Sequence, residues 1–237
     1  MKKTLITLLA LAGVATAETL TFLPSLNAGC THVSEEPRPS GITGDTELIA
    51  KSTISAAAVK AYMTSTVGSA LLEEGWHWGL ANMDNDNASD FVKDSDTGFT
   101  FRGRAAYGGE FVLATVDVGS LLKNESNVYV DSITLSFDVT EKNSLYFSAW
   151  TWDSTTQEAK SLIALQANPA EYEGTIENIS LTSKDKVLFI FGSDSGGKIN
   201  TIANIQSSYT TATIPEPATA TLSLLALAGL AARRRRH

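Results

Sequence analysis

The feature that most restricts the fold of this sequence is a strict alternation of apolar and polar residues over residues 128–139. The apolar members are Ile133, Leu135, Phe137 and Val139, and the polar members are Thr134, Ser136 and Asp138. Successive side chains of a β-strand point to opposite faces, so this segment predicts a strand with one buried and one solvent-facing side.

Further segments with strand character follow one another at short intervals, separated by turn residues. They cover residues 19–23, 76–80, 97–104, 110–118, 144–152, 161–166, 174–181, 187–191 and 199–206. Residues 187–191 form an unbroken apolar run, which is typical of a central strand. This spacing predicts a mainly β protein, an antiparallel β-sandwich.

Two parts of the body depart from the strand pattern. Residues 27–44 are rich in Gly, Pro, Ser and Glu and predict a loop. Residues 45–74 contain three successive alanines and a Leu-Leu-Glu-Glu stretch, which predict one or two short helices near the N-terminus.

The segment 193–197 reads Ser-Asp-Ser-Gly-Gly and is similar to the nucleophile loop of trypsin-like proteases. Ser193 stands where that loop has glycine, and Lys198 stands where it has proline. We interpret the segment as a Gly-rich hairpin turn between residues 187–191 and 199–205. We therefore predict no catalytic residue here, and Ser195→Ala should have no catalytic consequence.

Aspartates gather in two polar loops before and after residue 90. They are Asp84, Asp86 and Asp90, followed by Asp94 and Asp96. Ca²⁺ takes about six to eight oxygen ligands, of which such loops supply three or four. Solvated loop acids are the favoured interpretation, with Ca²⁺ as the alternative and no other cofactor expected.

Four tryptophans occur as two pairs with one residue between the members. Trp76 and Trp78 share one strand face, and Trp150 and Trp152 share another. Exposed aromatic faces stack on sugar rings, so these are candidate glycan-binding residues, Trp150 and Trp152 above all. Packing in the core is the favoured alternative, because tryptophan is usually well buried.

The first seventeen residues have the order of a secretory signal peptide. Lys2 and Lys3 precede a short apolar run, and Ala15-Thr16-Ala17 has the small-residue pattern of a cleavage site. The mature chain is expected to begin at Glu18.

The end of the chain combines three elements in a fixed order. The tripeptide Pro215, Glu216 and Pro217 comes first, and the uncharged segment 218–232 follows. The chain then closes on Arg233, Arg234, Arg235, Arg236 and a histidine. An apolar helix followed by cationic residues acts as a stop-transfer element, with the arginines on the cytoplasmic side.

This tail resembles the PEP-CTERM sorting signal of exported bacterial proteins. The resemblance implies recognition by an exosortase in the inner membrane, removal of the tail, and delivery to the cell surface or extracellular matrix. It divides the chain into a signal peptide (1–17), a body (18–213) and a sorting signal with a short transmembrane helix (214–237).

The body resembles the jelly-roll sandwiches that often accompany this signal, themselves similar to carbohydrate-binding modules. The resemblance lies in residues 133–138, in residues 187–191 and in the pair Asn204-Ile205, although Ala203 replaces the aspartate that often precedes this asparagine. It implies glycan binding as the leading activity. A secreted glycan-active or other hydrolase and a purely structural matrix protein remain the alternatives, and an enzyme is the less favoured class.

The net charge of the chain restricts the classes of binding partner, and its cysteine content restricts its disulfides. The chain has 18 basic and 26 acidic residues; without the two terminal segments, 12 and 25 remain, a net charge near −13. Such a body repels nucleic acid and anionic lipid and suits a polysaccharide ligand better. Cys30 is the single cysteine, so the chain has no intramolecular disulfide.

Overall fold

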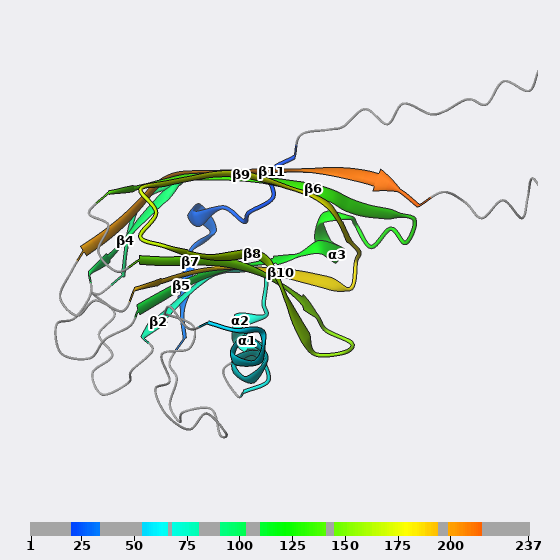
Figure 1. Ribbon diagram of the computed structural model, residues 1–237, viewed down its shortest axis with the longest axis horizontal. Helices are drawn as coiled ribbons and strands as arrows, with labels where there is room; N and C mark the ends of the chain where they lie inside the picture. The colour runs from blue at the N-terminus through cyan, green and yellow to red at the C-terminus, as the bar shows by residue number, and fades with distance from the viewer. Residues whose placement is uncertain are drawn as a thin grey trace, which may run out of the picture.

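The computed structural model describes residues 20–33, 54–65, 68–80, 91–102, 110–140, 145–193 and 199–214. Within these ranges the chain forms two sheets packed face to face, which confirms the predicted β-sandwich (Figure 1). In spatial order, the six-stranded sheet consists of β1 (Cys30–His32), β2 (Gly75–Leu80), β5 (Glu110–Asp117), β10 (Asp185–Ser193), β7 (Leu145–Asp153) and β8 (Glu158–Ala167). The five-stranded sheet consists of β3 (Phe91–Ser95), β4 (Gly98–Arg102), β11 (Ile199–Thr213), β6 (Val128–Thr140) and β9 (Glu171–Leu181).

The main core lies between the sheets and is built largely from alternating residues. The apolar side chains predicted for residues 128–139 are buried on the inner face of β6. Aromatic rings link the two layers: Phe137 of the five-stranded sheet meets Phe147 and Phe191 of the other at centroid distances of 4.8 Å and 5.2 Å. Such edge-to-face pairs add about 0.5–1.5 kcal/mol each to the burial of their surface.

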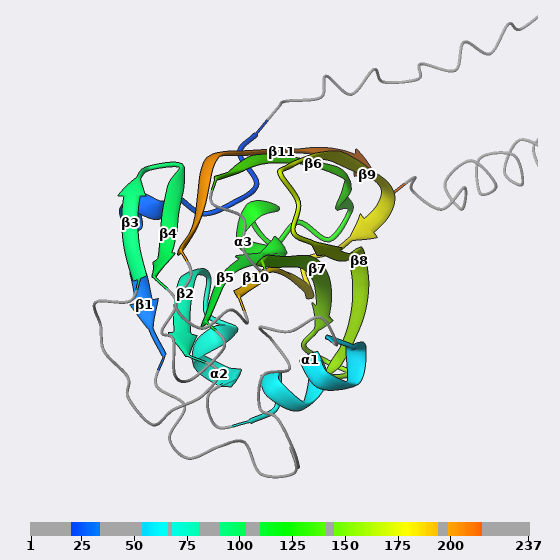
Figure 2. The ribbon, with the colours of Figure 1, turned by 60° about the vertical axis from the view of Figure 1, so that its left-hand side comes forward.

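The six-stranded sheet also buries much of its outer face. The helices α1 (Ala56–Met63) and α2 (Gly68–Leu71), which confirm the predicted helical region, lie against that face (Figures 1 and 2). In β10, Val187, Phe189 and Phe191 enter the main core, while Leu188 and Ile190 pack with the helices. This two-sided burial explains why residues 187–191 are apolar without interruption.

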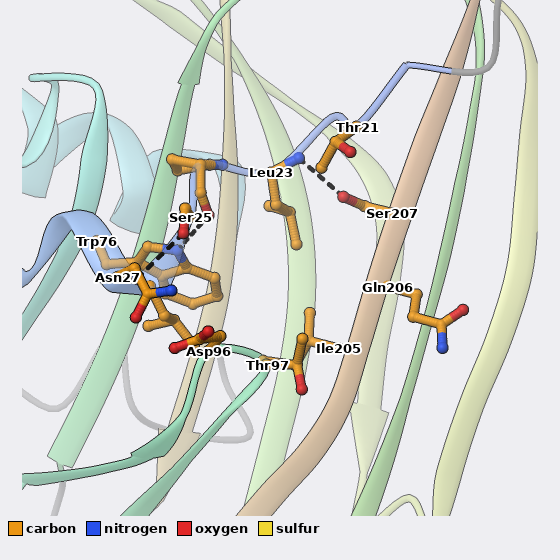
Figure 3. Close-up of a pocket in the computed structure, with 12 residues that line it drawn as sticks. Thr21, Leu23, Ser25, Asn27, Trp76, Asp96, Thr97, Ile205, Gln206 and Ser207 are labelled. Carbon is orange, nitrogen blue, oxygen red and sulfur yellow. Dashed lines mark hydrogen bonds between the residues drawn. The ribbon is translucent and has the colours of Figure 1, made fainter.

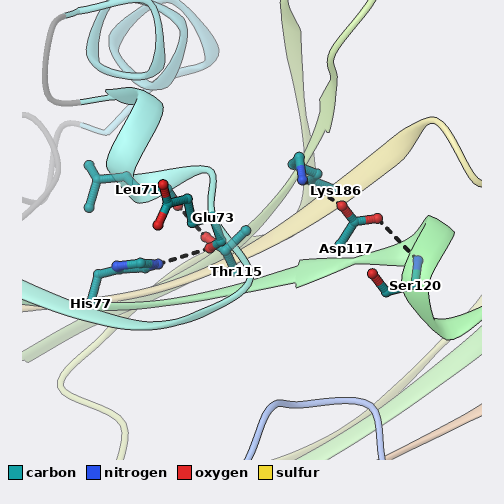
Figure 4. Close-up of polar contacts among 7 residues, drawn as sticks. All are labelled: Leu71, Glu73, His77, Thr115, Asp117, Ser120 and Lys186. Carbon is teal, nitrogen blue, oxygen red and sulfur yellow. Dashed lines mark hydrogen bonds and ion pairs between the residues drawn. The ribbon is translucent and has the colours of Figure 1, made fainter. Parts of the chain in front are cut away.

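Polar contacts hold α2 and its following turn onto the sheet (Figure 4). The buried Thr115 hydroxyl donates to the Leu71 carbonyl at 2.5 Å. His77 Nε2 lies 2.9 Å from the Glu73 carbonyl; a carbonyl only accepts, so this nitrogen carries the proton. Burial lowers the pKa of His77, although the carbonyl and carboxylate of Glu73 oppose that shift.

At the C-terminal end of β5, Asp117 begins the short helix α3 (Val118–Leu121), which the sequence analysis did not predict. Its carboxylate accepts from the Ser120 backbone N–H at 3.2 Å and from Lys186 Nζ at 2.7 Å (Figure 4). Despite partial burial, which opposes the shift, these contacts lower the pKa of Asp117. Asp117 is thus the N-cap of α3, and the same carboxylate forms an ion pair with Lys186 of β10.

The predicted strand at residues 19–23 is wrong. Leu20 forms only an isolated bridge to Tyr209, and the chain then runs between the sheets as far as the 3₁₀ helix η1 (Leu26–Ala28) (Figure 1). Phe22 is buried there, with ring centroids 5.9 Å from Phe189 and 5.7 Å from Tyr209. The segment is apolar because its side chains are buried between the two sheets, not because it forms a further strand of either sheet.

Two short strands were missed. The strand β1 lies inside the predicted loop 27–44 and pairs parallel with β2. The strand β3 pairs with β4 and includes Asp94, which was assigned to a polar loop. With three and five residues, these strands are too short to show a period in the sequence.

The predicted hairpin between residues 187–191 and 199–205 is also wrong. In the structure, β10 belongs to the six-stranded sheet and β11 to the five-stranded sheet. Since β5 and β7 already occupy both edges of β10, the chain must cross to the other layer. The intervening residues 194–198, including Ser195, lie outside the described residues.

The terminal elements also lie outside the described residues. These are the signal peptide with Ala15, Ala17 and Glu18, and the predicted C-terminal helix with its flanking motifs. Among the helices that the structure describes, none has the length and apolar character needed to cross a membrane.

The buried His77 predicts an acid-sensitive fold. The unfolded chain protonates His77 near its ordinary pKa of about 6.5, whereas the folded chain does so only at lower pH. Stability from this group is fully present above that value and is lost as pH falls below it, because the unfolded state then binds more protons. Urea unfolding between pH 7.5 and 5.5 should show this decline.

The control is His77→Gln, whose amide can donate to the same Glu73 carbonyl but does not titrate. Its unfolding free energy should fall less steeply over this pH range. Equal slopes in the two proteins would show that His77 does not contribute to the pH dependence.

Candidate ligand-binding site

A notch interrupts the five-stranded sheet along one edge of β11. The strand pairs with β4 only through Ile199–Ile202, and beyond that the Ile205 N–H donates to the Thr97 carbonyl at 2.9 Å. The next backbone contact on this side is the Tyr209 N–H with the Leu20 carbonyl, at 3.0 Å. Between these contacts lies an open cavity of about 500 Å³ (Figure 3).

Trp76 of the opposite sheet contributes to the floor of the notch. Its indole N–H donates to the Pro24 carbonyl at 2.7 Å, and its ring packs against Phe99 at a centroid distance of 5.8 Å. The buried side chains of Leu23 and Leu26 complete the apolar part. The indole is thereby fixed in place, with 2% of its surface exposed.

The rim of the notch is polar. It carries the side chains of Ser25, Asn27, Asp96, Thr97 and Ser207, and it is also bordered by Gln206, whose side chain points to the other side of β11 (Figure 3). The Ser207 hydroxyl accepts from the Leu23 N–H at 2.8 Å, and the Ser25 hydroxyl accepts from the Asn27 N–H at 3.1 Å. The lining that the structure describes includes no Lys, Arg or His, so the only formal charge among these side chains is that of Asp96.

Local backbone requirements shape two sides of the notch. A Cβ at Gly98 would lie 2.8 Å from the Ile202 carbonyl oxygen, so glycine is needed where the β3–β4 turn meets β11. Asn204 has a φ of 53° within a β-bulge between Ala203 and Gln206. Asparagine adopts this left-handed conformation more readily than most residues, which explains its presence at the bulge.

A second, more polar hollow of about 410 Å³ lies on the outer face of the same sheet. Its outward side chains are Ser136 and Asp138 of β6, Glu171 and Glu173 of β9, and Asn204 and Gln206 of β11. The Asn204 amide donates to the Asp138 carboxylate at 2.6 Å and holds it in place.

The four candidate tryptophans are all buried, with exposed fractions from 2% to 6%. Trp150 and Trp152 do share one face of β7, but that face packs under the helices with Tyr62 and Leu188. The Trp150 indole N–H donates to the Ser148 hydroxyl at 2.9 Å. The tryptophans are therefore packed in the core and form no exposed aromatic platform, and Trp76 also contributes to the floor of the notch.

The predicted metal ligands are divided among different places. Asp84, Asp86 and Asp90 lie outside the described residues, Asp94 is in β3, and Asp96 lies on the rim of the notch. Within the described part of the chain, no group of three or more His, Cys, Asp or Glu residues is arranged to hold a metal ion. Ca²⁺ binding at the first three aspartates stays the untested alternative to solvated loop acids.

The single cysteine and the sorting residues can be placed only in part. Cys30 is half-buried in β1, and burial raises the pKa of its thiol to about 12, so it is not a reactive thiolate at neutral pH. The sorting residues Pro215–Pro217 and Arg233–Arg236 lie outside the described residues.

Comparisons with known proteins give weak likenesses. No protein-family model matches this sequence, and no curated protein matches it. Among solved structures, the enzymatically active domain of tailspike protein 4 of bacteriophage CBA120 is 13% identical with a TM-score of 0.39. That match covers 57% of this chain and only 19% of the phage chain.

Two smaller proteins match over most of their own length. TmCBM61, solved with β-1,4-galactotriose, is 8% identical over 56% of this chain and 86% of its own, with a TM-score of 0.35. The xylan-binding module CBM15 is 13% identical over 60% of this chain and 94% of its own, with the same TM-score. At these scores and identities, no role for this chain follows from the likeness.

The buried state of Trp152 leads to a stability prediction. Trp152→Ala leaves a cavity beneath α1 and should lower the free energy of unfolding by about 3–5 kcal/mol. Chemical denaturation measures the loss, and Trp152→Phe, which keeps much of the packed volume, should cost less. A loss below about 1 kcal/mol for the alanine variant would mean that the indole is exposed in solution.

Proposed function

We propose that this chain is the precursor of an exported bacterial surface or extracellular-matrix protein whose jelly-roll-like body binds glycan. The notch beside β11 is the proposed site. The observation that carries the proposal is the combination, in one cavity of about 500 Å³, of an apolar floor and a rim of amide, hydroxyl and carboxylate groups.

The chemistry of the notch suits a sugar. A pyranose ring has apolar C–H faces and a rim of hydroxyls, each of which both donates and accepts hydrogen bonds. Leu23, Trp76 and Ile205 offer apolar surface. The Asn27 amide donates and accepts, and the Asp96 carboxylate accepts. A mostly apolar pocket with a few placed polar groups is the usual form of a small-ligand site.

The terminal segments support export and sorting. The signal-peptide pattern would direct the chain across the membrane, and segment 218–232 with its arginine block would hold the precursor there. An exosortase-type enzyme would then remove the tail at the Pro215–Pro217 motif. The inner membrane is thus a transient partner, and the proposed ligand is extracellular polysaccharide.

Glycan binding is tested with the purified full-length chain on a glycan array, followed by titration of the best ligand. Asn27→Ala should weaken binding by about fivefold, because it removes roughly 1 kcal/mol of hydrogen bonding. Gln166→Ala removes an amide on β8, outside the notch, and should leave affinity unchanged.

Other outcomes separate the alternatives. Release of reducing ends from the bound polysaccharide would identify a hydrolase. Absence of binding across the array would favour a purely structural matrix protein.

Tail removal is tested by mass spectrometry of the surface protein from a host that contains an exosortase. The mature C-terminus should lie near Pro215–Pro217, and replacing Glu216 with alanine should leave the precursor in the membrane fraction. Recovery of intact Arg233–Arg236 in surface material would contradict the proposal.

A further inference from the structure

The edge of β11 that borders the notch has one open backbone position. The N–H groups of Ile205 and Tyr209 both point away from β6, to partners at the two ends of the notch. Residues 206–210 follow a regular antiparallel register with β6. Alternate residues of such a strand direct their N–H and C=O groups to the same side. Those of Ser207 therefore also point away from β6, into the notch.

The backbone groups of Ser207 have no protein partner within the described residues. The neighbouring segment reaches this residue through its side chain instead, because the Leu23 N–H donates to the Ser207 hydroxyl at 2.8 Å. An unpaired strand edge presents its N–H and C=O groups to whatever lies beside it. The notch thus offers one backbone donor and one backbone acceptor whose positions are fixed by the sheet.

The opposite side of the notch offers polar side chains. Figure 3 shows Ser207 and Ile205 along β11 on one side, and Asn27 and Asp96 on the other. The side chain of Leu23 lies between the two sides and is apolar (Figure 3). A carboxylate only accepts hydrogen bonds. A ligand group that enters the notch therefore meets a backbone donor on one side, a carboxylate acceptor on the other and apolar surface between them.

A secondary amide that carries a methyl group matches this arrangement. Its C=O and N–H point in opposite directions, because the amide is planar and trans. It can therefore accept from the Ser207 N–H while it donates toward Asp96. Its methyl group needs apolar surface, which Leu23 and Ile205 supply. Among the substituents of sugars, the acetamido group has this combination, whereas a hydroxyl has no apolar part.

The short length of open edge argues against a peptide as the occupant. A peptide that adds to a sheet pairs with successive positions along an unpaired edge. Here the positions of Ile205 and Tyr209 are already paired, and that of Ser207 is the open one between them. A single amide group fits this gap, whereas an added strand does not.

We propose that the notch binds an N-acetylated sugar of an extracellular polysaccharide through the backbone edge at Ser207. The inference rests on the proposed glycan binding and specifies its ligand class. The acetamido carbonyl accepts from the Ser207 N–H, its methyl group lies against Leu23, and the hydroxyls of the ring contact the remaining rim. The neutral acetamido group also avoids the repulsion that the carboxylate of a uronic acid would meet at Asp96.

The test compares matched pairs of neutral glycans on the full-length chain by calorimetry. The first pair consists of β-1,4-linked oligomers of N-acetylglucosamine and of glucose, equal in length. The second pair consists of the methyl glycosides of N-acetylgalactosamine and galactose. In each pair the members differ only in the group at C2. In at least one pair the N-acetylated member should bind at least about tenfold more tightly, because the hydroxyl lacks the amide carbonyl and the methyl contact.

Two variants at one position separate the backbone contact from the side chain. Ser207→Pro removes the N–H that points into the notch, and this N–H takes no part in the ladder with β6. Ser207→Ala is the matched control, since it loses the same hydroxyl bond to Leu23 but keeps the N–H. The proline variant should lose the preference for the N-acetylated glycan, and the alanine variant should keep it.

Amide hydrogen exchange tests the same contact in the unaltered chain, so the result does not depend on whether the proline variant folds. The Ser207 N–H should exchange at least about tenfold more slowly once the chain is saturated with the N-acetylated glycan. The Tyr209 N–H, which is bonded to the Leu20 carbonyl, is the internal control and should change little.

Each contrary result has a distinct meaning. Equal binding of the members of both pairs would overturn the inference but keep the proposed function. A preference that survives Ser207→Pro, or an unchanged exchange rate at Ser207 in the saturated chain, would do the same. Binding of N-acetyl-tetra-alanine amide that is lost in Ser207→Pro would indicate a peptide ligand and overturn the inference. Failure of every glycan would overturn both.

Discussion

The structure depends on a sheet that must be buried on both faces. Strand β10 directs Val187, Phe189 and Phe191 to one side and Leu188 and Ile190 to the other. At about 1.5–3 kcal/mol for each buried large side chain, neither face can be left to solvent. The five-stranded sheet covers the inner face, and α1 and α2 cover much of the outer face. The sandwich therefore has two apolar clusters, one on each side of its central strand.

This two-sided burial also determines where a ligand can bind. The helices occupy the face on which Trp150 and Trp152 lie, so that surface is closed in this structure. The five-stranded sheet has a polar outer face, with paired hydroxyls such as Ser132 and Thr210 at 2.7 Å. The open, chemically varied surface is therefore on that sheet, where the notch and the outer hollow lie.

The sequence was informative where local pattern decides the structure. The alternation in β6 predicted a strand with one buried face, and the apolar run in β10 predicted a central strand; both are confirmed. The pattern could not show that β10 and β11 belong to different sheets, since that depends on β5 and β7, which pair with both edges of β10.

The candidate site was largely beyond prediction for a related reason. Its residues come from four separate segments, joined by contacts such as Trp76 with Pro24 and Leu23 with Ser207. Asn27 and Gln206 belong to no motif, and Asp96 was recognised only as a loop acid. The spacing of Trp150 and Trp152 correctly predicted that both lie on one face of a strand. It could not show what covers that face, because α1 is distant in sequence from β7.

The bridge between Leu20 and Tyr209 connects nearly opposite ends of the described chain. The strand that carries Tyr209 also lies in the interior of its sheet, between β4 and β6. During synthesis, the five-stranded layer therefore cannot close until almost the whole body has emerged, and Phe22 has no pocket before then. Contacts of such long sequence separation form slowly. Neither sheet can therefore be completed before β10 and β11, the last two strands along the chain, have been made.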